Sequence, residues 1–484
     1  MGFEVLGIAS QAIAAQQLAL DVTGNNMANA TTPGYHVESV NLTENAPAPD
    51  AVMPTTLIGN GVTATAVTRA TNAFLSSSVR NQTSAESYAT ALSQGLNQVQ
   101  NIFQEPQNGG LAEMMNQFNQ SWLTLSQNPE SLSARESVIQ DGKTLASTLN
   151  SMATTLSTEE AGVNQNIVSQ VSQVNQLAGQ IAKLNGQIAT VSTSGQQPND
   201  LLDQRGQLLT ELTKLVHVSY ANGPANSLDV YIGSHPLVTG ERTYQINATS
   251  STYGSTKITV PQWQDTGSDV QIQSGSLAGN IALLYTNSIN GSLSSGLKAG
   301  YLTGYGQKLD NIAQALATAV NTGQAAGYDL NNNPGATFFV AAAGPAGVPP
   351  TISASDIKVS SSLSANQLAA ASSSNAPGDG SHAESLYNTL SNTSLAIGNS
   401  TTTLAGYYQS VVGQVGIDGQ NASNLSTDSQ NTLTSLKNEL SSVTGVDLNQ
   451  QSVNMIQEQQ SYEAAAKLIT TQQTMIQSLL SAVG

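Results

Sequence analysis

Cysteine is absent from this 484-residue sequence. The chain therefore has no disulfide bond and no thiolate ligand for zinc or an iron–sulfur cluster. Charged residues are also scarce, at 9% of the chain against roughly 25% in ordinary soluble domains. Serine, threonine, asparagine, glutamine and alanine supply the polarity instead, and neutral polar groups lose less free energy than charges when they leave water. Such a surface favours close packing against many copies of itself.

Positive charge is the scarcer sign. The chain has 14 basic and 31 acidic residues, a formal net charge of −17, and its first basic residue is Arg69. A nucleic-acid partner requires clustered cations that neutralise phosphates, so none is expected. An anionic membrane surface is disfavoured for the same reason. Without an uninterrupted apolar run of about 18 residues, no transmembrane helix is expected.

The first residues lack the basic region of a secretory signal peptide. We therefore expect either a cytoplasmic protein or export without a cleaved signal.

Catalytic and metal-binding patterns are also missing. The histidines lie far apart, without an HExxH motif or a neighbouring carboxylate at metal-ligand spacing. Glu159 and Glu160 are adjacent, so on a helix their side chains diverge, and we interpret them as part of a solvated face. The sequence predicts no enzyme, no cofactor and no metal site. The four histidines are His36, His217, His235 and His382.

The length predicts about two to four domains, because it exceeds what one core supports. The longest apolar stripe at helical spacing runs from Leu145 to Val191, without a proline between Pro129 and Pro198. An unbroken helix there would span on the order of 80 Å, which only a rod-like bundle accommodates. Apolar periodicity predicts helices over about 3–30, 71–103, 110–127, 129–198, 305–322, 381–414 and 423–443.

Short β-type runs between glycine, proline and asparagine turns fill residues 216–285. The runs are Val216–Tyr220, Val230–Ile232, Tyr244–Ile246 and Ile258–Val260, and a smaller patch carries Phe338–Val340 and Ile357–Val359.

We predict an α+β multidomain fold, with a long helical bundle or coiled-coil arms from both chain ends and inserted β-rich domains. The predicted domains are terminal assembly helices (1–70 and 446–484), a helical rod (71–215 and 300–445, with a strand patch near 328–365) and an inserted β-rich domain (216–299).

Both chain ends carry apolar stripes at heptad spacing. The two stripes of the first end are Val5, Ile8, Ala12, Ala15, Ala19 and Val22, and beside them Leu6, Ile13, Leu20 and Met27. At the other end Met455, Tyr462, Ile469 and Ile476 recur every seven residues, and Leu468, Leu479 and Leu480 widen the face.

Two interpretations of these ends are open. The two helices could simply pair with each other. We favour the alternative, because the faces are wide and Lys467 is the only basic residue of the two ends. On that view neighbouring copies complete the faces, and the ends are disordered in the free subunit.

Several polar residues next to the first helix have two readings as well. Asn25, Asn26 and Asn29 either cap backbone groups or form hydrogen bonds across a junction between subunits. Pro33, Gly34 and Tyr35 end the helix and form a turn, and secondarily provide a contact point. The predicted assembly interface is Val5, Ile8, Ile13, Leu20, Asn25, Asn26, Asn29, Pro33, Gly34, Tyr35, Met455, Tyr462, Ala466, Lys467, Ile469, Ile476 and Leu480.

Near the end of the long helix, Arg205 is expected to form a structural ion pair with Asp203 or Asp200.

The residues Asn25-Asn26-Met27-Ala28-Asn29-Ala30-Thr31-Thr32-Pro33-Gly34-Tyr35 resemble the N-terminal signature of bacterial flagellar rod, hook and hook-associated proteins. The C-terminal signature of this family is similar to Gly445-Val446-Asp447-Leu448, Ile456-Gln457, Gln459-Gln460-Ser461-Tyr462 and Ala465-Ala466-Lys467. Among these flagellar proteins, the chain most resembles the hook-associated protein 1 family of hook–filament junction proteins. The residues that carry this resemblance are Leu201–Arg205, Phe118–Pro129 with Ala134-Arg135, and Ser355–Ile357.

The sequence departs from the family pattern at a few positions. His36 stands where a basic residue is common, so an ion pair is not expected there. Gly206 replaces a frequent acid, and Gln450 and Gln451 replace an acidic pair.

The resemblance implies a structural subunit of the bacterial flagellum, an adapter that joins hook to filament by helical self-assembly through its terminal helices. Its implied partners are other copies of the chain, hook protein, hook-associated protein 3 and an export chaperone on the C-terminal helix. Its implied location is extracellular, at the hook–filament junction, after type III export without a cleaved signal peptide. The alternatives are another axial subunit (hook or distal rod) and a secreted coiled-coil effector or glycosidase.

Overall fold

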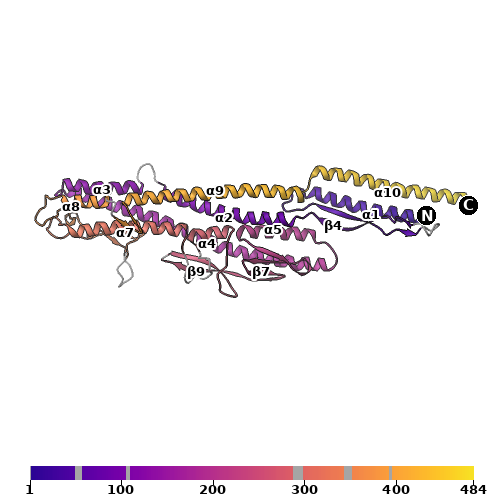
Figure 1. Ribbon diagram of the computed structural model, residues 1–484, viewed down its shortest axis with the longest axis horizontal. Coiled ribbons are helices and arrows are strands. Elements are labelled where there is room, and N and C mark those ends of the chain that lie inside the picture. The colour runs from indigo at the N-terminus through magenta and orange to yellow at the C-terminus, as the bar shows by residue number, and fades with distance from the viewer. Residues whose placement is uncertain are drawn as a thin grey trace. The chain divides into compact units, whose positions relative to one another are not determined.

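A computed structural model describes residues 2–49, 57–104, 110–254, 256–286, 298–342, 351–391 and 395–483. Within them the chain is mainly helical, and small antiparallel sheets lie between the helices (Figure 1), so the predicted α+β fold is confirmed. The described α-helices are α1 (Gly2–Ala28), α2 (Ala73–Phe103), α3 (Leu111–Gln127), α4 (Leu132–Thr193), α5 (Asn199–Leu215), α6 (Ser276–Leu284), α7 (Tyr301–Ala326), α8 (Ser381–Ser391), α9 (Leu404–Thr444) and α10 (Leu448–Val483).

The strands form one four-stranded sheet, ordered β5-β6-β7-β8, and a series of two-stranded pairs. The pairs are β1–β4, β2–β3, β9–β10, β11–β12, β13–β14 and β15–β16. The described strands are β1 (Glu38–Glu44), β2 (Ala48–Pro49), β3 (Leu57–Ile58), β4 (Val62–Arg69), β5 (Ser219–Asn222), β6 (Leu228–Ile232), β7 (His235–Thr239), β8 (Arg242–Thr243), β9 (Ile246–Tyr253), β10 (Thr256–Trp263), β11 (Tyr285–Thr286), β12 (Lys298–Ala299), β13 (Phe339–Ala341), β14 (Ile357–Val359), β15 (Ala396–Ile397) and β16 (Ser400–Thr401).

The chain divides into two compact units. Unit 1 comprises Met1–Glu86, Gln173–Gln245 and Ser429–Gly484, and unit 2 comprises Ser87–Ser172 and Ile246–Asp428. Both chain ends therefore belong to unit 1, together with the four-stranded sheet. The β9–β10 hairpin belongs to unit 2. This division crosses the three predicted domains, whose boundaries stay a prediction.

Helix α4 is 62 residues long, as the uninterrupted stripe predicted. Its apolar residues recur at helical spacing, so one side of the helix is buried along its length. The stripe residues that are fully or almost fully buried are Leu145, Leu149, Leu156, Val163, Ile167, Val171, Val174, Ile181 and Ile188.

Aromatic side chains form the core of unit 2 near α3. Phe118 of α3 lies 5.6 Å from Phe338 and 5.9 Å from Phe339, measured between ring centroids. Trp122 completes the cluster and is fully buried. A Cβ atom at Gly142 of α4 would lie 2.5 Å from the Phe338 ring, so only glycine allows this close approach.

The predicted helix over 381–414 is wrong at its centre. Helix α8 ends at Ser391, the β15–β16 hairpin follows, and α9 begins at Leu404. Gly398 forms the hairpin turn with a φ of +55°, a conformation that glycine adopts without strain. Helix α9 then continues to Thr444, so the separate helix predicted over 423–443 is its second half.

Smaller differences concern the β-rich segments. The strand predicted at Tyr244–Ile246 is wrong, since β8 ends before Tyr244 and β9 starts at Ile246. Helix α6 was not predicted, because six of its nine residues are buried and no amphipathic pattern results. In the patch near 328–365, the two predicted strands are confirmed as β13 and β14, and the structure shows that they pair with each other. Residues 343–350 lie outside the described residues.

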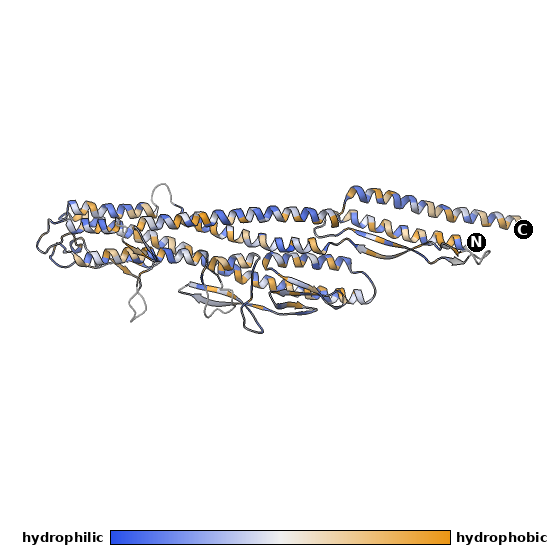
Figure 2. Cartoon of the chain, viewed as in Figure 1, coloured by the Kyte–Doolittle hydropathy of each residue, from blue (hydrophilic) through white to orange (hydrophobic). Residues whose placement is uncertain are grey.

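Helix α1 differs from expectation in one respect. Among the described residues, Glu4–Ala28 is long and apolar enough to cross a membrane, judged by length and composition alone. The expectation that the chain has no transmembrane helix stays a prediction, because a helix of a soluble protein can have the same length and composition. In the structure this helix packs against α10 and the β1–β4 ribbon, and apolar and polar residues alternate along both terminal helices (Figure 2).

Candidate assembly interface and its polar anchor

The two chain ends pair with each other. Oγ1 of Thr23 donates to Oε1 of Glu458 (3.1 Å), and Nδ2 of Asn26 donates to Oε1 of Gln451 (3.2 Å). The order of these contacts makes α1 and α10 antiparallel. The structure thus contains the direct pairing that was the simpler of the two interpretations, and both ends are helical in it, whereas disorder was expected for the free subunit.

The α1–α10 seam is narrow. On α1 it buries Ala9, Ala15, Ala19 and Val22, and on α10 only Ala465 and Gln451 are buried among the described side chains. Small residues allow the helices to approach but bury little apolar area. Large apolar side chains stay exposed, and we call them the open apolar face: Val5, Leu18, Val453, Ile456, Tyr462, Leu468, Met475, Ile476, Leu479 and Leu480.

The predicted interface residues fall into three groups by exposure. Asn26 alone is buried, at 1% exposure. The exposed members are Val5, Asn25, Pro33, Gly34, Tyr462, Lys467, Ile476 and Leu480. The half-buried members are Ile8, Ile13, Leu20, Asn29, Tyr35, Met455, Ala466 and Ile469.

Asn26 connects three segments of unit 1. Its Nδ2 donates to the Glu38 carbonyl (2.8 Å) as well as to Gln451. Its Oδ1 accepts hydrogen bonds from the Tyr35 hydroxyl (2.8 Å) and the Glu38 amide (2.9 Å). The side-chain amide therefore has all four of its hydrogen bonds, and it fixes the end of α1 to both the following turn and the start of α10.

The other two asparagines make local contacts. Nδ2 of Asn29 donates to the Asn25 carbonyl oxygen (3.2 Å) and to its Oδ1 (2.9 Å). Thr32 in turn donates to Oδ1 of Asn29 (3.2 Å). The Asn25 carbonyl also accepts the backbone N–H of Asn29 (3.0 Å), so the Asn29 side chain adds a second hydrogen bond to a carbonyl in the last turn of α1.

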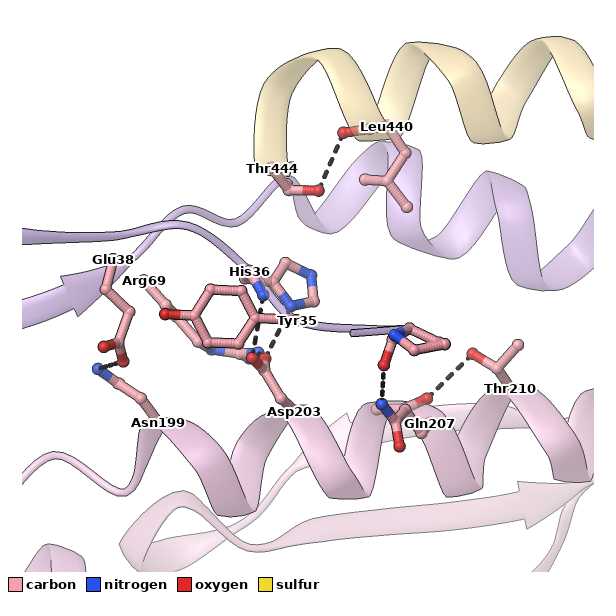
Figure 3. A network of polar contacts seen from close by, with 12 residues as sticks. Tyr35, His36, Glu38, Arg69, Asn199, Asp203, Gln207, Thr210, Leu440 and Thr444 are labelled. Carbon is pink, nitrogen blue, oxygen red and sulfur yellow. Dashed lines mark hydrogen bonds and ion pairs between the residues drawn. The ribbon is translucent and has the colours of Figure 1, made fainter. Parts of the chain in front are cut away.

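Asp203 of α5 is the centre of a second set of contacts (Figure 3). Its Oδ2 accepts the backbone N–H of His36 (3.1 Å), and its Oδ1 lies 2.7 Å from Nδ1 of His36. Oδ1 also accepts Nη1 of Arg69, at the end of β4. Asp203 is only 8% exposed. The expectation that His36 forms no ion pair stays a prediction, because this contact is a hydrogen bond of a neutral imidazole and an ion pair only of a protonated one.

The predicted ion pair of Arg205 with Asp203 or Asp200 is wrong. Nη1 of Arg205 donates to Oδ1 of Asn185 (2.9 Å) and to the Asn226 carbonyl (2.7 Å). The two residues are two positions apart on α5, about 200° around the helix axis, so Asp203 and Arg205 point to different neighbours. Burial, and then the positive charge of Arg69, lowers the pKa of Arg205 to about 10.

Helix α5 presents one polar face to the segment after α1. Asn199, Asp203 and Gln207 stand at i, i+4 and i+8, so they lie on the same side of the helix. Nδ2 of Asn199 donates to Oε1 of Glu38 (2.7 Å), and Nε2 of Gln207 donates to the Pro33 carbonyl (Figure 3). These contacts hold the turn over residues 33–38 against α5.

Gly34 is required by this turn. Its φ is +77°, and a Cβ atom there would lie 2.6 Å from Cγ of Gln207. The chain after the turn is also tied to the end of α9, because the Val37 amide donates to the Thr444 carbonyl (2.9 Å). We call Asn26, Tyr35, His36, Asp203 and Gln207, with their partners, the polar anchor.

Sequence reasoning missed several members of the anchor, although a signal was present. The polar residues of α5 repeat at helical spacing next to a motif already singled out for its family resemblance. Their partners in the folded chain could not be read from that spacing. The missed residues are the anchor members Glu38, Arg69, Gln207 and Gln451, and beside them Asn199, which binds Glu38, and Glu458, which binds Thr23.

Glu160 departs from the solvated face predicted for the Glu159-Glu160 pair. Glu159 and Glu160 are both half-buried, and Glu160 lines a cavity of about 600 Å³ in unit 2, which Asp310 and Lys257 also line. Burial, and then the charge of Asp310, raises the pKa of Glu160 to about 7. Within the described part of the chain, no group of three or more His, Asp or Glu side chains could hold a metal ion.

Family models match three stretches of the chain. Residues 96–339 match the flagellar hook-associated protein FlgK helical domain. Residues 6–36 match the flagella basal body rod protein, and residues 441–482 match the C-terminal region of the flagellar basal body rod FlgEFG proteins.

Two relatives with the same name are similar to this chain. Flagellar hook-associated protein 1 of Bacillus subtilis is 30% identical over 506 residues, which is 100% of this chain and 98% of that protein. The Salmonella typhimurium protein of the same name is 31% identical over 67% of this chain and 57% of its own length.

A solved structure supports the fold. The flagellar hook junction protein FlgK from Burkholderia pseudomallei matches with a TM-score of 0.64 at 17% identity, covering 76% of this chain and all of that chain. The full-length relatedness to the Bacillus protein and the helical-domain match carry the family assignment. The chain belongs to the flagellar hook-associated protein 1 family and is a structural component of the flagellum, not an enzyme.

Proposed function

We propose that this chain is the adapter that joins the hook to the filament. In this proposal, copies assemble through α1 and α10, and the predicted interface residues lie between neighbouring copies. The family assignment supports a flagellar role, and the open apolar face supports the use of the terminal helices.

The exposure of α10 is the observation that carries the proposal. Leu479 and Leu480 are 64% and 69% exposed, and Ile456 is 55% exposed. Full burial of one such side chain contributes about 1.5–3 kcal/mol, so several of them offset the entropy that association costs. Among the described side chains of α10 only Gln451 and Ala465 are buried, so this helix has most of its stabilisation still to gain from a neighbour.

The polar anchor gives the arm formed by α1 and α10 a defined attachment. Asn26 fixes the two helices to each other at one end, and Asp203 fixes the following turn to α5. A fixed attachment lowers the conformational entropy lost on assembly, because the apolar face is oriented beforehand.

Other proteins are proposed to bind the terminal helices as well. We propose that hook protein and hook-associated protein 3 contact assembled copies, and that an export chaperone covers the apolar face of α10 before assembly. The proposed location is extracellular, at the hook–filament junction, after type III export.

Deletion of the gene tests the adapter role. We expect cells that carry hooks without filaments and that release flagellin into the medium. Complementation with the full chain should restore filaments, whereas a chain lacking residues 450–484 should not. The control is a chain with Lys437→Ala, an exposed position of α9. Normal filaments in the deletion strain would refute the proposal.

A further inference from the structure

A small polar cavity lies in unit 1 between α5 and the turn after α1. Its volume is about 270 Å³. Asn25, Asn29 and Tyr35 line one side, and Asp200, Asp203 and Gln204 of α5 line the other. The carboxylates of Asp200 and Asp203 are acceptors only, so the cavity can accept hydrogen bonds from a cationic donor.

The cavity is electrostatically negative. Burial raises the pKa of Tyr35, and the charges of Glu38, Asp200 and Asp203 raise it further. Asp203 is already paired with His36 and Arg69. Asp200 is exposed and has no hydrogen bond or ion pair to another described residue, so its carboxylate is available to a cation.

None of the described residues that line the cavity is basic. Arg69 is held by Asp203, and Lys214 donates to Glu211 (2.6 Å). The remaining base of the terminal helices is Lys467, which lies 16 residues after Gln451 on α10. At a rise of about 1.5 Å per residue, that separation is about 24 Å, well beyond the length of a lysine side chain.

Lys467 has the properties of the missing partner. It is exposed, it forms no ion pair with the described residues, and Leu468 of the open apolar face follows it directly. Copies with a net charge of −17 repel one another, so a contact between opposite charges fixes the register of two copies as well as attracting them.

We infer that the cavity formed by Asn25, Tyr35 and Asp200 binds the ammonium group of Lys467 from a second copy of the chain. This inference rests on the proposed function, because it presumes that copies meet at their terminal helices. It adds to that function a specific ion pair that sets how far one copy is displaced along the next.

Charge reversal tests the inference in the purified full-length chain, with self-assembly followed by light scattering and sedimentation. Asp200→Lys and Lys467→Asp should each raise the concentration needed for assembly by about tenfold or more, as expected for a contact of at least about 1.4 kcal/mol. The double variant, with both charges exchanged, should assemble nearly as well as the unmodified chain. Lys437→Asp, a reversal on α9 with the same change in net charge as Lys467→Asp, is the control and should have a small effect.

The possible outcomes separate the inference from the proposed function. If the double variant assembles no better than the single ones, or if Lys467→Asp assembles normally, the inference is wrong, although assembly through the terminal helices can still hold. If Asp200→Lys blocks binding to hook protein but not self-assembly, the cation comes from that partner and the inference is equally wrong. If removal of residues 450–484 leaves self-assembly unchanged, the proposed function itself fails. Far-UV circular dichroism of each variant verifies folding.

Discussion

Nδ1 of His36 lies 2.7 Å from Oδ1 of Asp203, although the two residues are 167 positions apart in the sequence. The same carboxylate accepts the His36 amide and contacts Arg69. One side chain of α5 therefore holds the segment that follows α1 in place.

Replacement of this carboxylate should loosen the anchor. Asp203→Asn removes the charge that faces Arg69 and His36, and loss of one member of a largely buried ion pair costs about 3 kcal/mol. We expect faster hydrogen exchange at the His36 amide and in the turn over residues 33–38. The control is Gln204→Ala on the same helix. Unchanged exchange at His36 would show that the carboxylate does not hold the turn.

The two adjacent asparagines should behave differently. Asn26→Ala leaves the Tyr35 hydroxyl, the Glu38 amide and Gln451 without their partner, and unsatisfied buried groups cost about 1–3 kcal/mol each. Asn25→Ala changes an exposed side chain and should cost less than about 0.5 kcal/mol. Denaturant unfolding monitored by far-UV circular dichroism compares them. Equal losses in the two variants would contradict the assigned role of Asn26.

Unit 2 should lose stability as the pH rises through the titration of Glu160. Its pKa is raised from 4.5 to about 7 in the folded protein, so the folded state favours the neutral acid. The free-energy penalty for ionising Glu160 in the folded protein is absent below about pH 4.5, grows up to about pH 7 and is constant above it.

Glu160→Gln should remove this penalty. We expect a gain of about 1–2 kcal/mol at pH 8 and little change at pH 4.5, a discounted figure because the carboxyl is partly exposed to solvent. Thermal unfolding followed by tryptophan fluorescence measures it, since both tryptophans, Trp122 and Trp263, are buried in unit 2. Glu159→Gln is the matched control, and an equal gain in that variant would argue against burial as the cause.

The second half of α10 should open easily in the free subunit. Trypsin should cleave after Lys467 at least about tenfold faster than after Arg135 or Arg205, which are buried, because cleavage requires local opening. Circular dichroism with and without residues 1–35 and 450–484 gives an independent measure of terminal helicity. Full helicity, with amide protection as strong as in α4, would mean that the ends are complete without a neighbour.

Local patterns were sufficient for much of the fold. The apolar stripe from Leu145 to Val191 identified α4, because apolar residues at helical spacing without a proline are typical of a helix that buries one side. The strands β13 and β14 were predicted from two short β-type runs, and their pairing was not predicted. The pattern failed at 381–414, because the apolar residues on either side of the β15–β16 hairpin happen to keep a helical spacing.

Which polar groups meet was decided by tertiary structure. The sequence placed Asn26 and Tyr35 in the predicted interface. It also predicted an ion pair between Asp203 and Arg205, which the structure does not contain. Side chains two positions apart on a helix point in different directions, so Arg205 reaches Asn185 while Asp203 reaches His36 and Arg69.

By itself, the sequence determined most of the long helices, the apolar stripes of the two ends and the shortage of charge, because these depend on neighbours within a few residues along the chain. Only the folded chain decided that the two ends pair through alanines and leave the leucines and isoleucines outside. That choice depends on which faces of α1 and α10 are turned toward each other, and the orientation is set by contacts such as Asn26 with Gln451, between residues 425 positions apart.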